Sequence, residues 1–148
     1  MRKSSLVTGQ QLTGANKQEA LQQLAHAAAT TLNLDEIEVK ATLMTREALA
    51  DTALISGIAI PHIIIDKEFT PRICVGLLAS PLEDWDCLDG TKVHLLLAFA
   101  VPQRTLVHQQ EIREISEMIT QLADEQFCWR VSQAQTVAEV SAILSEER

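Results

Sequence analysis

Apolar residues recur at helical spacing twice in the first third of the chain. In residues 15–32, alanines and leucines fall three or four positions apart, which is typical of an amphipathic helix. Residues 36–50 repeat this spacing, and Asp35 stands where a helix N-cap belongs. We therefore predict two helices, with Arg46 in the last turns of the second. The buried stripe expected for that second helix is Ile37, Ala41, Met44 and Ala48.

The pattern then changes to short, nearly continuous apolar runs bounded by Gly, Pro and Asp. Such runs are typical of strands that are covered on both faces of a sheet. Asp89-Gly90 is a strong tight-turn signal and predicts an antiparallel ribbon that leads into the third run, so the sheet should be mixed. The runs are "GIAIP" at 57–61, "RICVGLLAS" at 72–80 and "VHLLLAFAVP" at 93–102.

Helical spacing returns in the last third of the chain. Isoleucines and a leucine in residues 107–124 predict a long helix, and His108, four positions before Ile112, falls in its first turn on the inward stripe. Residues 125–131 predict a short helix anchored by Phe127 and Trp129. A capping box opens the final helix, whose expected buried face is Val137, Val140 and Leu144; the box residues are Thr136 and Glu139.

Helices before, between and after the strands indicate an α/β (α+β) fold. The 148 residues contain 47% hydrophobic and 22% charged residues, with no repeat or Gly/Ser linker, so we expect a single domain over 1–148. The formal net charge of −8 disfavours nucleic acid and anionic membranes as partners.

Neither a signal peptide nor a membrane span is evident in the sequence. The longest apolar run, residues 95–101, is too short to cross a bilayer, so we expect a cytoplasmic protein with no membrane insertion. The three cysteines, Cys74, Cys87 and Cys128, lack CxxC spacing and are interpreted as reduced, mostly buried thiols.

One histidine interrupts an apolar run, in "GIAIPHIII" at 57–65. Pro61 stiffens the chain before His62, and a neutral imidazole held in one direction can accept a phosphoryl group on a ring nitrogen. Arg46 and His108 can supply donors to the phosphate oxygens. Because the chain has no GxxxxGK[ST] loop and no carboxylate cluster for magnesium, the donor should be another protein, with no cofactor or metal.

The residues alone leave other interpretations open. A lone histidine on an apolar segment is more often a structural residue, and that interpretation is preferred for His94 and His26. Arg46 also fits a solvated cation at a helix end, and His108 fits packing at a helix start. A metal hydrolase built from His62, His94 and His108 lacks an HExxH pattern or an acidic partner at ligand spacing.

The segment "SGIAIPH" at 56–62 closely resembles the active-site segment of the IIA component of the fructose/mannitol class in the bacterial sugar phosphotransferase system, a class with nitrogen-related regulatory members. The family's Arg-Glu pair is matched by Arg46 and Glu47, and the Thr of its Ser-Thr pair by Thr52. Its downstream tryptophan, Asp-Gly turn and helix-opening histidine are matched by Trp85, Asp89-Gly90 and His108, so the motifs cover roughly residues 42–122.

This resemblance implies a mixed sheet of about five strands flanked by helices. It also implies that His62 receives phosphate from the histidine-containing phosphocarrier protein and passes it to a IIB partner for sugar uptake, while His108 and Arg46 steady the phosphorylated ring. A regulatory module that binds target proteins according to its phosphorylation state is the alternative.

Four positions depart from the family pattern. Ile63 stands where Gly, Ala or Cys is usual and is expected to crowd the phosphate or the partner. Ala53 and Ile55 occupy positions that are often glycine, which is expected to reshape turns that need positive φ, and Ser56 replaces an Asn or Glu. These departures favour a specialised or regulatory member, or one that has lost activity.

Overall fold

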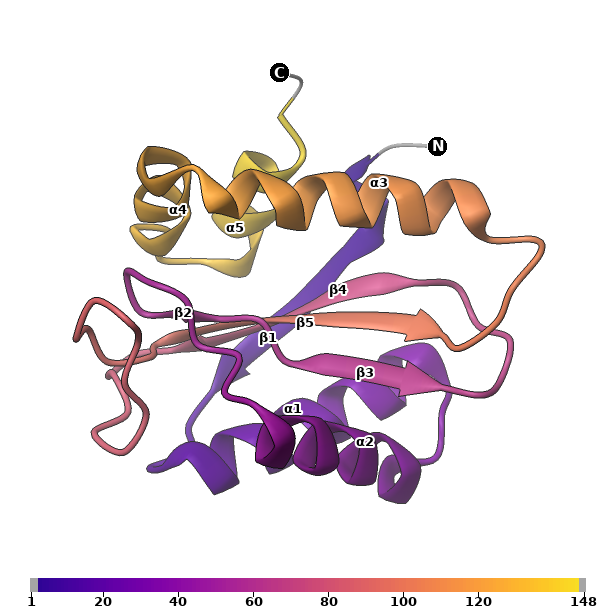
Figure 1. Cartoon of the computed structure of the whole chain (residues 1–148), viewed down its shortest axis with the longest axis horizontal. Helices are drawn as coiled ribbons and strands as arrows, with labels where there is room; N and C mark the ends of the chain where they lie inside the picture. The colour runs from indigo at the N-terminus through magenta and orange to yellow at the C-terminus, as the bar shows by residue number, and fades with distance from the viewer. Residues whose placement is uncertain (1–2, 147–148) are drawn as a thin grey trace.

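A computed structural model describes residues 3–146, and its centre is a mixed sheet (Figure 1). Within these residues the sheet has five strands, in the order β1-β4-β5-β2, with β3 also paired to β5. The pair β4–β5 is antiparallel and the other pairs are parallel, which confirms the predicted mixed sheet. The strands are β1 Val7–Leu12, β2 Ile58–Ala59, β3 His62–Ile65, β4 Arg72–Leu78 and β5 Leu95–Pro102.

Helices cover both faces of this sheet, as Figure 1 shows. One face packs against α1 Lys17–Leu32 and α2 Glu36–Leu49, and the other against α3 Gln109–Thr120, α4 Glu125–Ser132 and α5 Val137–Leu144. Side chains of β5 alternate between the two cores because successive residues of a strand point to opposite faces. Two short 3₁₀ segments, η1 Lys3–Leu6 and η2 Gln121–Ala123, complete the elements.

Local capping signals fix where the helices begin. Asn16 accepts a hydrogen bond from the Glu19 amide at the start of α1, and Asp35 caps α2 as predicted. At α5 the Thr136 hydroxyl accepts from the Glu139 amide at 3.1 Å, so the predicted capping residue is confirmed. Such caps satisfy amide groups that have no partner inside the helix, which is why they could be identified from sequence.

Two predicted buried faces differ from the structure. Helix α2 buries Val39, Leu43 and Glu47, whereas Ile37 is 78% exposed. The stripe predicted from Ile37, Ala41, Met44 and Ala48 was therefore wrong, although Met44 packs at the edge of the core. The prediction failed because it assumed that an acidic residue faces solvent. Glu47 is buried because its carboxylate has polar partners, which the hydropathy pattern does not reveal.

Trp129 was also wrongly predicted as an anchor. It is 58% exposed on α4, whereas Phe127 is buried as expected. The two residues are two positions apart and therefore lie on different sides of a helix.

Two strands were not predicted. Strand β1, "VTGQQL", lies at the edge of the sheet and exposes Gly9, Gln10 and Gln11. It was missed because an edge strand of this kind has no apolar run. Strand β3 begins at His62, which pairs with Phe99 of β5, so this histidine opens a strand instead of ending one. Pro61 separates β2 from β3, and its carbonyl still accepts the Phe99 amide at 2.8 Å.

Candidate functional site

The segment between α2 and β3 folds back on itself and delivers His62 to the sheet. The amide of Ile60 donates to the carbonyl of Thr52 at 3.0 Å, and the amide of Leu54 donates to the carbonyl of Ile58 at 2.8 Å. The reversal occurs at Ser56 and Gly57, whose φ values are 56° and 76°. The backbone before His62 is thus held by its own hydrogen bonds.

The imidazole of His62 is half-buried and lies edge-on to Phe99, with ring centroids 6.1 Å apart and an interplanar angle of 77°. Burial lowers the pKa of His62 below its ordinary value, and the positive charge of Arg46 lowers it further. The charge of Glu47 and the backbone of Ile60 act in the opposite direction with smaller effect on the pKa. The neutral imidazole is therefore favoured at pH 7.

The two ring nitrogens of His62 have different surroundings. Nδ1 is buried and has no hydrogen-bond partner among residues 3–146. Nε2 is not among the buried atoms without a partner in the described residues, so it is the ring nitrogen that a reactant from solvent can reach.

Arg46 lies in the last turn of α2, as predicted. Its Nη1 donates to the carbonyl of Ala50 at 2.8 Å, which holds the guanidinium at the helix end. Since a guanidinium has five N–H donors in a planar fork, this contact leaves others for an anion. Arg46 lies near enough to His62 for its charge to lower the pKa of the imidazole, although no hydrogen bond joins the two side chains among residues 3–146.

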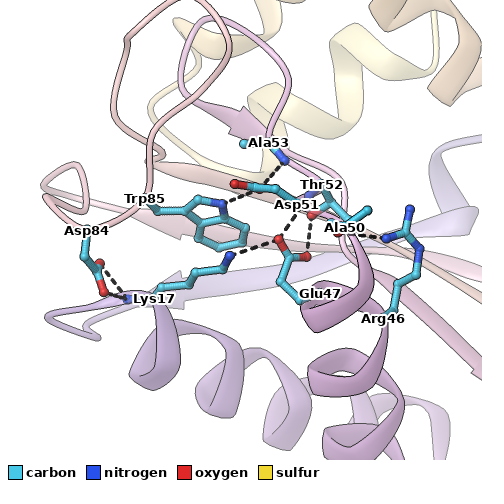
Figure 2. A network of polar contacts seen from close by, with 9 residues as sticks. All are labelled: Lys17, Arg46, Glu47, Ala50, Asp51, Thr52, Ala53, Asp84 and Trp85. Carbon is cyan, nitrogen blue, oxygen red and sulfur yellow. Dashed lines mark hydrogen bonds and ion pairs between the residues drawn. The ribbon is translucent and has the colours of Figure 1, made fainter.

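Glu47 is the centre of a polar network beneath the loop (Figure 2). Its carboxylate accepts hydrogen bonds from the amide and the hydroxyl of Thr52, at 3.0 and 2.7 Å. Lys17, the first residue of α1, forms an ion pair with it at 3.1 Å, and the exposed fraction of the Glu47 side chain is only 5%. The family resemblance indicates Glu47, but no pattern in the sequence assigns a role to Lys17.

Trp85 links this network to the following part of the loop. The Lys17 ammonium lies 4.5 Å from the indole centroid, and the indole N–H donates to Asp51 at 2.8 Å (Figure 2). Asp51 also accepts from the amide of Ala53 at 2.9 Å. Burial alone would raise the pKa of Asp51, but these hydrogen bonds and the charge of Lys17 hold it below its usual value. Asp51 was likewise missed, because its partner is 34 positions away.

His108 lies in different surroundings. It was predicted in the first turn of the helix, but it is the N-cap residue of α3, one position before the helix begins at Gln109. Its Nδ1 lies 3.5 Å from Glu111 and its Nε2 lies 3.9 Å from Glu68, and its amide donates to the Thr105 hydroxyl. In the described part of the chain, no hydrogen bond or ion pair joins His108 to His62 or Arg46.

The sheet register explains this separation. His62 pairs with Phe99 and opens β3, whereas Ile65 pairs with Pro102 where both strands end. Figure 1 shows the chain leaving the carboxyl end of β5 before it turns back into α3. His108, at the start of α3, therefore follows the carboxyl ends of β3 and β5, whereas His62 lies at the start of β3.

The structure shows where the four departures from the family pattern lie. Ile63 is fully buried in the core beside α1 and α2, on the face of β3 opposite to His62, so the predicted crowding of the phosphate by its side chain was wrong. Ala53 and Ile55 have negative φ, so no turn is strained by their lack of glycine. Ser56 adopts the left-handed conformation instead, and its amide donates to Asp89 at 3.0 Å.

The other reactive side chains have structural surroundings. All three cysteines are free and buried, and burial raises the pKa of Cys74 to about 12. His94 lies 2.9 Å from the Ser132 carbonyl through Nε2 and packs over Gly57, where an added Cβ would come within 2.3 Å of its ring. His26 pairs with Glu36 in solvent.

The described residues contain neither a cluster of metal ligands nor a membrane-spanning helix. Between residues 3 and 146, no group of three or more His, Cys, Asp or Glu residues is arranged to hold a metal ion. Among the helices of this same range, none combines the length and apolar character needed to cross a membrane.

The sequence and the fold place this chain in a known family. Residues 2–147 match the family model described as phosphoenolpyruvate-dependent sugar phosphotransferase system, EIIA 2. The chain belongs to this family. A nitrogen regulatory protein from Klebsiella oxytoca is 31% identical over 141 residues, covering 94% of this chain and 85% of that protein.

Solved structures agree with this fold. The nitrogen regulatory protein IIA-Ntr from Neisseria meningitidis superposes with a TM-score of 0.75 at 19% identity, covering 95% of this chain and 97% of that chain. The mannitol IIA enzyme of Escherichia coli, solved in complex with phosphorylated mannitol IIB, gives a TM-score of 0.64 at 20% identity and covers 93% and 92%. These likenesses confirm the predicted fold class.

Proposed function

We propose that this chain is a phosphocarrier of the IIA type, which accepts a phosphoryl group on His62 from the histidine-containing phosphocarrier protein and passes it to a IIB partner. The observation that carries the proposal is a half-buried imidazole, held neutral by burial and by the adjacent Arg46, on a segment fixed by backbone hydrogen bonds. A neutral ring nitrogen has the lone pair that phosphoryl acceptance needs.

The reacting atom is Nε2, because Nδ1 is buried. In the proposed step, the Nε2 lone pair forms a bond to phosphorus while the bond between phosphorus and the donor histidine breaks. The ring of His62 keeps its Nδ1 proton and becomes a phosphoimidazolium. The donor ring, protonated on its second nitrogen, takes the electron pair of the broken bond and leaves as a neutral imidazole. No metal, nucleotide or further reactant is required for the balance.

Arg46 and His108 are proposed to stabilise the transferred group. Arg46 can direct N–H donors to phosphate oxygens while its contact with Ala50 keeps the guanidinium in place. His108 is proposed as a second donor. Because no described contact joins its ring to His62, the phosphoryl group or a shift of residues 103–108 must bridge the two.

A regulatory module is the second candidate, favoured by the relative named nitrogen regulatory protein, which matches 94% of this chain. In that case the phosphorylated and unphosphorylated forms would bind a target protein differently, and transfer to a IIB partner would be weak or absent. Sugar uptake and regulation share the first step, phosphorylation of His62, and differ in the fate of the phosphoryl group afterwards.

The test is incubation of the protein with the general phosphotransfer proteins and labelled phosphoenolpyruvate. We expect a label on Nε2 of His62 that is labile in acid and stable in alkali. Full labelling of His62→Ala, or no labelling of the folded wild type with several donor systems, would overturn the proposal. Addition of IIB proteins to the labelled protein then separates a carrier, which loses its label, from a regulatory module, which keeps it.

A further inference from the structure

We propose that Lys17 is a positioning residue for the phosphoryl acceptor His62, an inference that rests on the proposed function. Lys17 does not contact His62. It acts through Glu47 and the loop that Glu47 holds, and it comes from α1, which lies outside the segment of matched motifs.

Lys17 is fixed at both ends. Its amide donates to both carboxylate oxygens of Asp84, at 2.9 and 3.2 Å, and its ammonium lies between the Glu47 carboxylate and the face of Trp85 (Figure 2). Its side chain is 27% exposed. A lysine restrained in this way acts as a fixed charge, unlike the mobile lysines of a protein surface.

A continuous series of contacts leads from Lys17 to the reactive histidine. The ammonium pairs with Glu47, and Glu47 accepts both the amide and the hydroxyl of Thr52. The carbonyl of Thr52 in turn accepts the amide of Ile60, two residues before His62. Each contact in the series is 3.1 Å or shorter, so displacement of Glu47 is transmitted to the backbone that orients the imidazole.

The ammonium is needed because Glu47 is buried. A carboxylate with a 5% exposed side chain is costly unless a cation and hydrogen bonds compensate its charge. Without Lys17, Glu47 would have to take up a proton or turn toward water. Either change weakens its hold on Thr52 and alters the charge that His62 experiences from Glu47.

The experiment compares Lys17→Met with Lys17→Arg, which retains the charge. Lys67→Met is the matched control, because Lys67 also forms an ion pair, at 3.3 Å from Glu38, but on the exposed surface. Phosphorylation of His62 is measured against the concentration of the donor protein. Amide hydrogen exchange of Thr52 and Ile60 and stability toward urea are measured on the same samples.

For Lys17→Met we expect the rate at saturating donor to fall about tenfold to a hundredfold with little change in KM, since displacement of a reacting group by about 1 Å costs this much. Exchange at the Thr52 and Ile60 amides should become faster. Lys17→Arg should restore most of the rate, and Lys67→Met should match the wild type.

Three outcomes would overturn the proposal: an unchanged rate in Lys17→Met, a change in KM alone, or a loss of rate that only tracks global stability while amide exchange is unaffected. If Lys17→Met does not fold, Lys17→Gln, which is neutral but can donate to Glu47, takes its place. If the wild type itself is not phosphorylated, the proposed function fails, while amide exchange still tests the link between Lys17 and the loop.

Discussion

The two histidines singled out from the sequence lie at opposite ends of β3 and in opposite electrostatic settings. His62 opens the strand beside a cation, and burial together with Arg46 lowers its pKa. His108 caps α3 beyond the other end of the strand, with the carboxylates of Glu68 and Glu111 near its two nitrogens. Glu47 acts on the pKa of His62 in the opposite direction, but burial and Arg46 outweigh it, whereas both nitrogens of His108 face carboxylates.

This difference in surroundings favours different roles for His62 and His108. A neutral ring beside an arginine is suited to accept a phosphoryl group and to hold the resulting negative charge. A ring beside carboxylates is suited to donate N–H groups. In the proposed role, His108 would turn these donors from Glu68 and Glu111 to the phosphate oxygens. Substitutions at the two ends should therefore give separable defects.

The largest effect is expected from His62→Ala, which should abolish labelling from phosphoenolpyruvate, because the acceptor nitrogen is removed. The loss should exceed about a thousandfold, on the order of what removal of a nucleophile costs. The measurement is incorporation of labelled phosphate, with circular dichroism as the control for folding. If the variant is still labelled, the acceptor is another residue, and the proposed difference in role between His62 and His108 is wrong.

His108→Ala should have the next largest effect. We expect His62 to accept phosphate slowly and to pass it to a IIB partner about a hundredfold less efficiently, because one donor to the developing charge is lost. Rapid-quench measurement of both steps tests this. His26→Ala, whose ring is exposed beside Glu36, is a cleaner control than His94→Ala, because His94 packs on Gly57. Equal rates in His108→Ala and wild type would exclude His108 from the site.

Arg46→Lys should slow transfer about tenfold, because the lysine keeps the charge but loses the planar fork. The fold should be unaffected, since a partly exposed helix-end cation adds little stability. The measurement is the rate of His62 phosphorylation at equal donor concentration. Unchanged kinetics would show that Arg46 is only a solvated cation at a helix end.

A sharper test of the same contact is the titration of His62 by NMR. Arg46→Met should raise the pKa of His62, because a repelling positive charge is removed, and Glu47→Gln should lower it, because an attracting negative charge is removed. Opposite shifts from neighbouring residues on α2 are not expected from general loosening of the structure. Shifts of the same sign in both variants would contradict the assigned electrostatics.

The smallest expected effect concerns stability against pH. The pKa of His62 in the folded protein lies below the value of 6.5 that it has without the fold, chiefly because of burial. Between these two values the unfolded chain binds more protons, so the free energy of unfolding should fall as the pH decreases through this window. Urea unfolding of wild type and His62→Gln across this range measures the difference. A parallel decline in both would assign the loss to other groups.

Signals that act over a few residues were predicted correctly from the sequence. Helix caps at Asp35 and Thr136, the turn at Asp89-Gly90 and the apolar runs of β4 and β5 depend on neighbours in the chain, and the structure has them where they were predicted. The histidine after Pro61 and the arginine near the end of α2 were also identified, because a rigid approach and a helix end are local properties.

Burial and long-range pairing were decided only by the tertiary structure. Strand β1 has no apolar run, and it is a strand because β4 offers hydrogen bonds to its backbone in register. Ile63 lies away from the ring of His62 because the pleat turns its side chain to the core beside α1 and α2. Glu47 is buried because Lys17, from a different helix, and Thr52 meet it there. The sequence determined which groups are available for phosphoryl chemistry, whereas their charge states and orientation depend on neighbours that only folding brings close.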